Sequence, residues 1–257
     1  KPTFNPNKFV HGISKDDWEV LLKDKKKPLI NKTLAGLYPP GSTIKPIVSL
    51  SALENEIISK NFLVECRGST SMYGQTYHCW NDKGHGYMNL RSAIKQSCDV
   101  YFYEVARRLG VDRLAETARN FGLGKKSLNK FNEERSGVVP DTKWKLEKIG
   151  KNWVIGETLI SGIGQGYFQT TPIQLCRMIA QLANGGYEIQ PRIIDDKYAL
   201  QNTIDAWREK FSSNKNGTNL LSGNLKKLYK DEKNIKIVLE AMYAATNEPL
   251  GTSYRSR

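Results

Sequence analysis

The chain has 257 residues, of which 39% are apolar and 10% aromatic; these values are typical of a globular protein and exclude wholesale disorder. The sequence contains no run of about eighteen apolar residues, so we expect no membrane-spanning helix in it. The formal net charge of +13 favours an anionic partner, but the basic residues are scattered apart from a run at 23–27, and we expect no nucleic-acid binding.

Residues 1–37 are polar and form a predicted approach segment, with a short helix at 16–23. The chain opens at Lys1 without a signal-peptide pattern. We therefore interpret it as an excised part of a longer protein.

A Pro-Pro-Gly turn at 39–41 precedes Ser42, and apolar periodicity after it predicts a core helix over 43–60. Ser42 and Lys45 are three residues apart, so on a helix they share one face. A desolvated lysine with a lowered pKa can take the proton of a neighbouring serine and make it a nucleophile. Since Ser-x-x-Lys is a common tetrapeptide, the pair alone indicates catalysis only weakly.

Residues 61–88 are rich in glycine and aromatic residues and predict a long loop or hairpin, which needs an internal staple. Helical spacing follows over 90–109 with a break near Ser97, and a further helix is predicted over 112–121. At the break, Ser97 and Asp99 are two positions apart and can point into one cleft. The same pair is also typical of a turn or a helix cap.

Residues 125–160 are predicted to be loop-rich. The glycine-rich turn Gly162-Ile-Gly-Gln-Gly166 then leads to a helix over 171–183, with Thr171 as its N-cap and Pro172 in its first turn. The turn departs from nucleotide-binding spacings, so we expect it to position a helix beside the cleft. A hairpin or edge strand at 186–194, a surface insertion at 195–234 and an amphipathic helix at 235–245 complete the predicted elements.

Three cysteines and a histidine form the candidate metal site: Cys66, Cys79, His85 and Cys98. Such a set is typical of structural zinc and would staple the 61–88 segment. A Cys66–Cys79 disulfide, expected in an oxidising compartment, and buried free thiols remain alternatives. The other candidate ligands are predicted to be structural: Cys176 in the core, and His11 and His78 on the surface.

Taken together, Ser42-x-x-Lys45, Ser97-x-Asp99 and the segment 162–174 resemble, in order and spacing, the penicillin-binding proteins and serine β-lactamases. Tyr38-Pro-Pro-Gly, Gly84-His-Gly and Glu133-Glu-Arg-Ser-Gly make the chain similar to the class B enzymes of cell elongation, the penicillin-binding protein 2 type. The resemblance covers residues 34 to 250.

This resemblance implies a helix-rich α/β fold, in which a helical lobe packs on an antiparallel sheet that is incomplete here, with residues 1–257 forming a truncated transpeptidase domain. It implies a D,D-transpeptidase that cross-links peptidoglycan stem peptides and is acylated by β-lactam antibiotics. The enzyme would act at the periplasmic face of the bacterial inner membrane, held by an anchor outside this chain, beside an elongation-complex glycosyltransferase.

The resemblance also implies a role for each motif residue. Ser42 would be the acylated nucleophile, Lys45 its general base and Ser97 a proton shuttle. Asp99 stands where this superfamily often has asparagine, and it would pair with Lys45 as in elongation-type members. Some of these relatives carry zinc beside the same motif, with aspartate sometimes replacing cysteine.

One family motif, Lys-Ser/Thr-Gly on a sheet strand, does not occur in the sequence. It would supply substrate contacts and one donor of the oxyanion hole, with the Ser42 amide as the other. We therefore expect this chain alone to be acylated slowly or not at all. Two other functions remain open: a β-lactamase or β-lactam sensor, which needs a deacylation device, and a non-catalytic zinc-stabilised scaffold.

Overall fold

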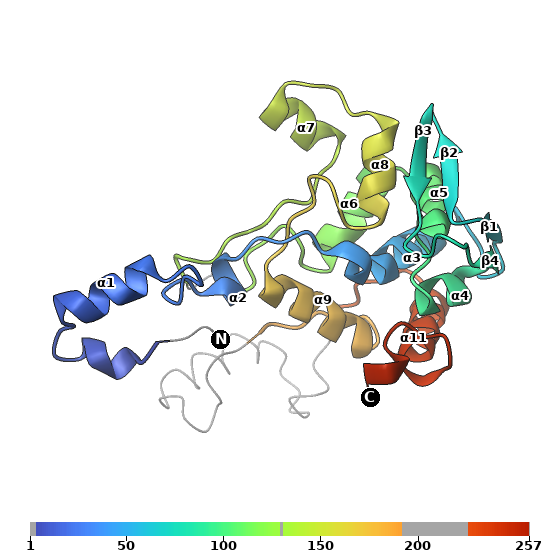
Figure 1. Ribbon diagram of the computed structural model, residues 1–257. Coiled ribbons are helices and arrows are strands. Elements are labelled where there is room, and N and C mark those ends of the chain that lie inside the picture. Colours follow the sequence, from blue (N-terminus) through green and yellow to red (C-terminus); the bar gives the residue numbers. More distant parts are fainter. Residues whose placement is uncertain (1–3, 129–130, 192–225, 257) are drawn as a thin grey trace, which may run out of the picture.

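The computed structural model describes residues 4–128, 131–191 and 226–256. Its helices are η1 (Pro6–Phe9), α1 (Lys15–Lys23), α2 (Lys32–Ala35), η2 (Gly41–Ile44), α3 (Lys45–Glu54), α4 (Leu90–Lys95), α5 (Asp99–Leu109), α6 (Val111–Asn120), α7 (Thr142–Ile149), α8 (Ile155–Gly162), α9 (Pro172–Ala183), α11 (Glu232–Asn247) and η4 (Tyr254–Ser256). Its strands are β1 (Val64–Cys66), β2 (Ser69–Met72), β3 (Gln75–His78) and β4 (Gly86–Met88). The described chain is therefore helix-rich, as predicted (Figure 1).

Helix α3 is the centre of the core, because every residue from Lys45 to Leu53 is buried. It packs against α5, α6 and α11, while α5 also packs on α8 and α11 on α4. The helix is shorter than the predicted 43–60. It ends where Glu56 turns into the left-handed region at φ 56° and Ile57 donates its N–H to the Ala52 carbonyl at 2.9 Å, a bond that closes a helix C-terminus.

The 61–88 segment folds into two small antiparallel sheets, which are the sheets of the described residues. Strand β1 pairs with β4 with Cys66 opposite Gly86, and β2 pairs with β3 with Ser69 opposite His78. The predicted antiparallel content is present in this loop rather than as a partly built central sheet. A two-stranded sheet is only marginally stable by itself. The stability of this segment therefore depends on its contacts with the rest of the protein.

Several predicted helices are confirmed: α1, the pair α4 and α5 with a break between them, α6, α9 and α11. Helix α9 begins as predicted, with Thr171 accepting from the Gln174 N–H in a capping box. His11 and His78 are exposed, as predicted.

Other predictions are wrong or incomplete, or fall largely on residues outside the described ranges. Residues 125–160 contain α7 and the start of α8; the N-cap of α8 is Val154, whose side chain gives no capping signal. The predicted strand near 186–194 shows one isolated bridge, Tyr187 to Lys227, and its last residues lie outside the described ranges. Cys176 is exposed rather than in the core. Most of the predicted insertion at 195–234 is also outside those ranges, and its described end enters α11.

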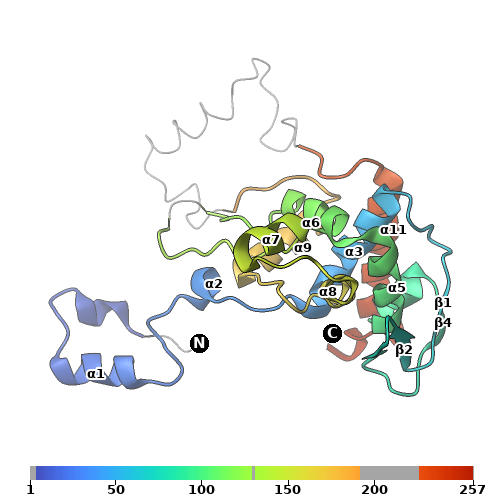
Figure 2. The same cartoon turned by 90° about the horizontal axis from the view of Figure 1, so that it is seen from above.

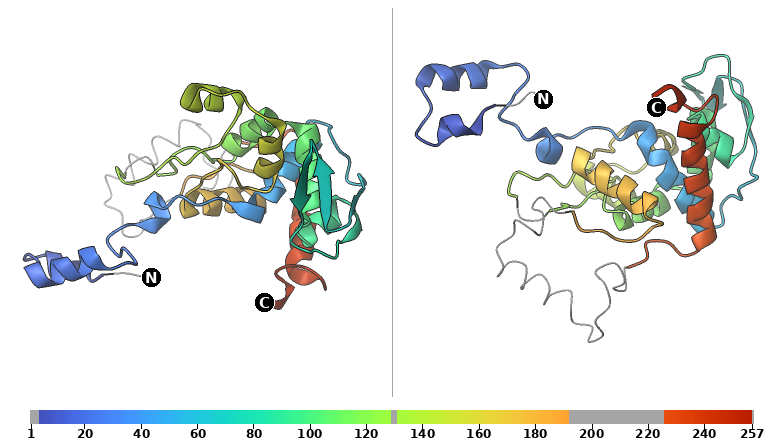
Figure 3. Two further views of the ribbon diagram at one scale, coloured as in Figure 1. Left: turned by 45° about the horizontal axis from the view of Figure 1, so that its top comes forward. Right: turned by 90° about the horizontal axis from the view of Figure 1, so that it is seen from below.

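The N-terminal segment with η1 and α1 extends away from the helical body in every view (Figures 1, 2 and 3). Its helix carries no buried residue, which agrees with an approach segment, although the division into segments stays a prediction. Within the described ranges, no helix combines the length and the apolar character that a membrane crossing requires.

The contact between α5 and α8 provides a stability test. A Cβ added at Gly162 would lie 2.4 Å from the Ala106 Cβ and 3.1 Å from the Phe102 carbonyl oxygen. We expect Gly162→Ala to lower the free energy of unfolding by about 1–3 kcal/mol, because two buried helices must move apart. Urea denaturation measures the change.

The matched control is Gly156→Ala in the same helix, where a Cβ would meet only the Tyr77 hydroxyl oxygen. The buried Tyr77 ring must move slightly, but alanine favours a helix by about 1 kcal/mol over glycine, which offsets that cost. We expect this variant to be neutral or stabilising. Equal stability of the two variants would contradict the close approach of α5 and α8.

Candidate active site

Ser42 lies exposed in η2, at the N-terminal end of the buried helix α3. The turn before it is held by Gly164, whose carbonyl accepts the Gly41 N–H at 2.9 Å. Gly164 has φ 73°, and a Cβ there would lie 2.2 Å from the Gly41 carbonyl oxygen, so only glycine fits. The glycine-rich segment thus packs against the nucleophile turn, in keeping with the predicted structural role.

Lys45 points into the core and is 2% exposed. Its Nζ donates to Asp99 Oδ1 at 2.7 Å, to the Ser97 carbonyl at 2.9 Å and to Ser97 Oγ at 3.0 Å, and it lies 5.3 Å from the centre of the Phe102 ring. Burial lowers the pKa of Lys45, while the charge and hydrogen bond of Asp99 oppose that change. Lys45 therefore loses its proton more readily than an exposed lysine does.

Ser97 connects the buried lysine to the exposed serine, since Ser97 Oγ donates to Ser42 Oγ at 2.9 Å. The described residues thus join Lys45 to Ser42 through Ser97, rather than by the direct contact that the i, i+3 spacing predicts. The reason is the 3₁₀ turn, which leaves Ser42 at the surface while Lys45 begins the buried helix. The structure brings the motif residues together in one chain of hydrogen bonds.

The backbone of Ser97 adopts the left-handed conformation with φ 52°. Ser97 donates its N–H to the Ile94 carbonyl at 3.2 Å and Cys98 donates to the Ala93 carbonyl at 3.0 Å, the two bonds of a Schellman motif. Glycine is usual at this position because a side chain there costs about 1–2 kcal/mol. A serine here gives the turn a hydroxyl at the expense of strain.

The four candidate metal ligands lie together beside this turn, with their ligand atoms within 4.8 Å of one another. His85 Nδ1 is 3.6 Å from Cys66 Sγ and 3.5 Å from Cys79 Sγ. Standard Zn–S and Zn–N lengths place such atoms roughly 3.6 Å apart around one tetrahedral zinc ion. All three cysteines are free thiols, so the structure shows no Cys66–Cys79 disulfide, and the donor set fits zinc.

One thiol of this cluster, that of Cys79, favours the deprotonated form that binds a metal. A hydrogen bond from Cys98 lowers the pKa of Cys79 to about 4, and the same bond together with burial raises the pKa of Cys98. One thiolate is therefore available at neutral pH, and thiolates are the metal-binding form of cysteine.

Two contributors to the site have no clear sequence signal, Phe102 beneath Lys45 and Trp80 beside the Ser97 turn. Phe102 is one of many apolar residues of α5. Trp80 is exposed and adjoins Cys79, so only its position next to a candidate ligand singles it out.

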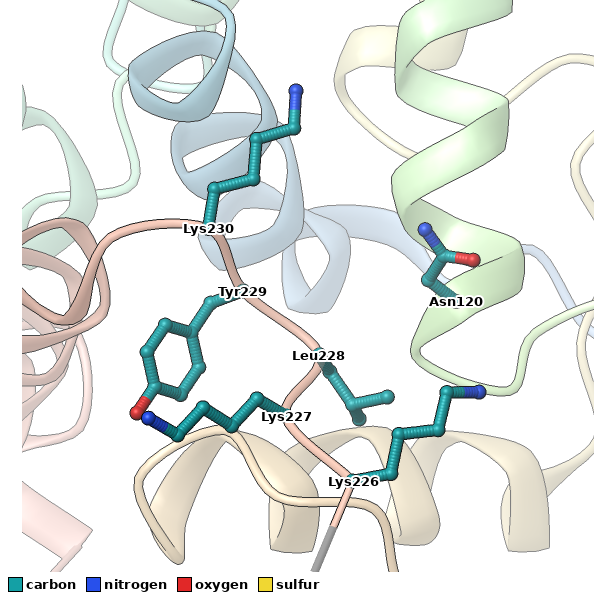
Figure 4. Close-up of a pocket in the computed structure, with 6 residues that line it drawn as sticks. All are labelled: Asn120, Lys226, Lys227, Leu228, Tyr229 and Lys230. Carbon is teal, nitrogen blue, oxygen red and sulfur yellow. The ribbon is translucent and has the colours of Figure 1, made fainter.

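A separate hollow of about 230 Å³ is lined by Asn120 and residues 226–230 (Figure 4). There Lys230 and Asp231 donate their N–H groups to Glu54, at the opposite end of α3 from Ser42. Its lysines are exposed and its lining includes none of the motif residues, so this hollow is separate from the candidate active site.

Ser42, Lys45 and Ser97 are thus joined by hydrogen bonds, and comparison with known proteins identifies the family of the chain. The model of the penicillin-binding protein transpeptidase domain matches residues 1–256. The chain therefore belongs to the penicillin-binding protein transpeptidase domain family.

Within that family, the chain is similar to the peptidoglycan D,D-transpeptidases named MrdA. It is 40% identical to that of Escherichia coli K12 over 195 residues, which are 75% of this chain and 31% of the relative. It is 36% identical to that of Salmonella typhimurium LT2 over 256 residues, 99% of this chain and 39% of the relative. The chain thus spans about a third of these proteins.

Comparison with solved structures leads to the same family. Pseudomonas aeruginosa PBP2 in complex with WCK 5153 matches with a TM-score of 0.83 and 35% identity, over 99% of this chain and 55% of that one. PBP2 from Helicobacter pylori, in its complex with MreC, matches with a TM-score of 0.83 and 32% identity, over 98% of this chain and 43% of that one. The fold and the penicillin-binding protein 2 resemblance are confirmed.

The ion pair of Lys45 yields a direct test. Asp99→Asn removes the charge that opposes burial, so we expect the pKa of Lys45 to fall further below its usual range. An NMR titration of ε-¹³C-lysine, assigned with Lys45→Arg, measures it. Glu104→Gln is the control, because this carboxylate of the same helix pairs with Arg107 and Arg108 instead. An unchanged or raised Lys45 pKa in Asp99→Asn would contradict the pairing.

Proposed function

We propose that this chain carries the acyl-transfer chemistry of a peptidoglycan D,D-transpeptidase and that Ser42 is its nucleophile. The observation that supports this most directly is the hydrogen-bonded path from buried Lys45 through Ser97 to exposed Ser42. The names of the MrdA relatives supply the substrate class: the stem peptides of peptidoglycan, with β-lactams as inhibitors that acylate the same serine.

The path accounts for activation of the serine. In the structure Lys45 Nζ donates to Ser97 Oγ, and Ser97 Oγ donates to Ser42 Oγ. Both hydrogen bonds run from the lysine toward the surface, which is the direction expected when the resting lysine is charged. Once Lys45 is neutral, rotation of the two hydroxyls reverses the donors. The proton of Ser42 then passes to Ser97 while the Ser97 proton passes to Lys45, and Ser42 Oγ attacks the substrate carbonyl.

Asp99 has a different role from the asparagine that often occupies this place. Its Oδ1 accepts from Lys45 and its Oδ2 from the Trp80 amide, so both carboxylate oxygens are used within the protein. We infer that Asp99 orients Lys45 and balances its charge, rather than binding the substrate.

We also propose that Cys66, Cys79, His85 and Cys98 hold a structural zinc ion. The support is the separation of the ligand atoms, the free thiols and the place of Cys98 between Ser97 and Asp99. Bound zinc would tie the 61–88 segment to the catalytic turn and would take no part in acyl transfer.

The setting of the enzyme follows from its relatives. One similar structure is a complex of PBP2 with MreC, and another is described as a peptidoglycan synthase complex that coordinates polymerization and crosslinking. We propose that the protein acts at the periplasmic face of the bacterial inner membrane, where a glycosyltransferase supplies the strands that it cross-links.

The function can be tested in a chimera in which residues 1–256 replace the matching part of Salmonella typhimurium MrdA, so that the family's Lys-Ser/Thr-Gly strand is supplied. We expect a fluorescent penicillin to label the chimera stably. Ser42→Ala should lower the rate of labelling by a factor of about 10³ or more. The chain alone should label slowly or not at all.

Ser49→Ala is the matched control, because Ser49 lies in α3 and its buried hydroxyl has no hydrogen-bond partner. Its labelling should equal that of the parent chimera. Labelling that survives Ser42→Ala would refute the proposed nucleophile. Label that is bound and then rapidly released would favour a β-lactamase, and an unlabelled parent chimera would favour a non-catalytic scaffold.

The zinc proposal has its own test. We expect the purified chain to contain about one equivalent of zinc and a chelator to lower its melting temperature, since binding energy of a structural metal is folding energy. Cys98→Ser should lose the metal. Cys176→Ser is the control, because this exposed cysteine lies outside the cluster. Less than about half an equivalent of zinc in the parent chain would contradict the proposal.

A further inference from the structure

The C-terminal end of α4 presents carbonyl groups that its own helix cannot satisfy. The Schellman bonds use the N–H groups of Ser97 and Cys98, while the carbonyls of Gln96 and Ser97 accept hydrogen bonds from side chains. The Ser97 carbonyl receives Lys45 Nζ. A second donor is needed to fix both carbonyls and the left-handed backbone between them.

That donor is Trp80, which comes from the 61–88 segment. Its indole Nε1 donates to the Gln96 carbonyl and to the Ser97 carbonyl, both at 3.0 Å. Its backbone N–H donates to Asp99 Oδ2, also at 3.0 Å. One residue therefore holds the catalytic turn on both sides of Cys98.

The candidate metal cluster fixes Trp80 in turn. Its neighbour Cys79 is buried and accepts the Asp99 N–H at 3.4 Å. Its ring meets the His85 ring edge-on, with centres 5.3 Å apart. Trp80 thus stands between the cluster and the relay.

We propose that Trp80 is a positioning residue for the Ser97 relay, an inference that rests on the proposed acyl transfer. By holding the Ser97 carbonyl, the indole keeps Ser97 in the left-handed region and its hydroxyl within hydrogen-bond reach of both Lys45 and Ser42. Without the indole donor, the strained turn relaxes and the hydroxyl leaves the proton path.

The surroundings of Trp80 separate this role from packing. The side chain is 62% exposed and lines an open hollow of about 510 Å³ together with Leu250 and Tyr254. The substitution Trp80→Phe removes the N–H donor but keeps an aromatic ring beside His85. It therefore removes little contact with the core.

The test uses the MrdA chimera, with Trp80→Phe compared with Trp153→Phe. Trp153 is the matched control, because its Nε1 donates to Thr158 Oγ1 at 2.8 Å, away from the relay. Labelling over a range of fluorescent penicillin concentrations separates the acylation rate constant, the initial affinity and the final amount of label. We expect Trp80→Phe to lower the rate constant about tenfold with affinity and amount unchanged, and Trp153→Phe to change none of them.

A Trp80→Phe rate equal to that of the parent overturns the proposal, and so does a loss of final label at an unchanged rate constant, which would indicate a merely structural role. Hydrogen exchange of the Cys98 amide in the chain alone provides a readout without acylation. We expect exchange about tenfold faster in Trp80→Phe than in Trp153→Phe, and equal protection overturns the proposal. An unlabelled parent chimera refutes the proposed function separately.

Discussion

The buried ammonium of Lys45 is the constraint on which the site depends. A charge that is 2% exposed is tolerated only when its hydrogen bonds are satisfied inside the protein. Ser97 and Asp99 provide all three oxygens that it contacts. The α4–α5 turn must therefore lie against the first turn of α3, and the packing of α3 on α5 holds it there.

This demand explains a strained serine at the end of α4. Glycine would satisfy the backbone of the Schellman motif, yet it would leave Lys45 with two oxygens and Ser42 without a link to the lysine. Positions that break a local rule are characteristic of functional sites. Here the surroundings over-determine the turn, since Lys45 and Trp80 both bind the Ser97 carbonyl.

The sequence predicts the parts of this site better than their connection. Ser42, Lys45, Ser97 and Asp99 belong to short motifs, and helices with caps, such as α9 after Thr171, have local signals. The relay depends on a 3₁₀ turn and a left-handed serine, which the motif spacing does not encode. Helix α8 lacks a capping side chain at Val154, and Trp80 becomes significant only when residues sixteen and seventeen positions away reach it.

The cysteine–histidine cluster connects the turn that binds Lys45 to the 61–88 segment. The segment that carries Trp80 has only three- and four-residue strands in two-stranded sheets, too little for independent stability. Cys66, Cys79 and His85 come from that segment, whereas Cys98 is part of the α4–α5 turn. A metal shared by the four would lock a weak sheet to a strained turn, so the order of the loop and the geometry of the proposed proton path would be set by the same contacts.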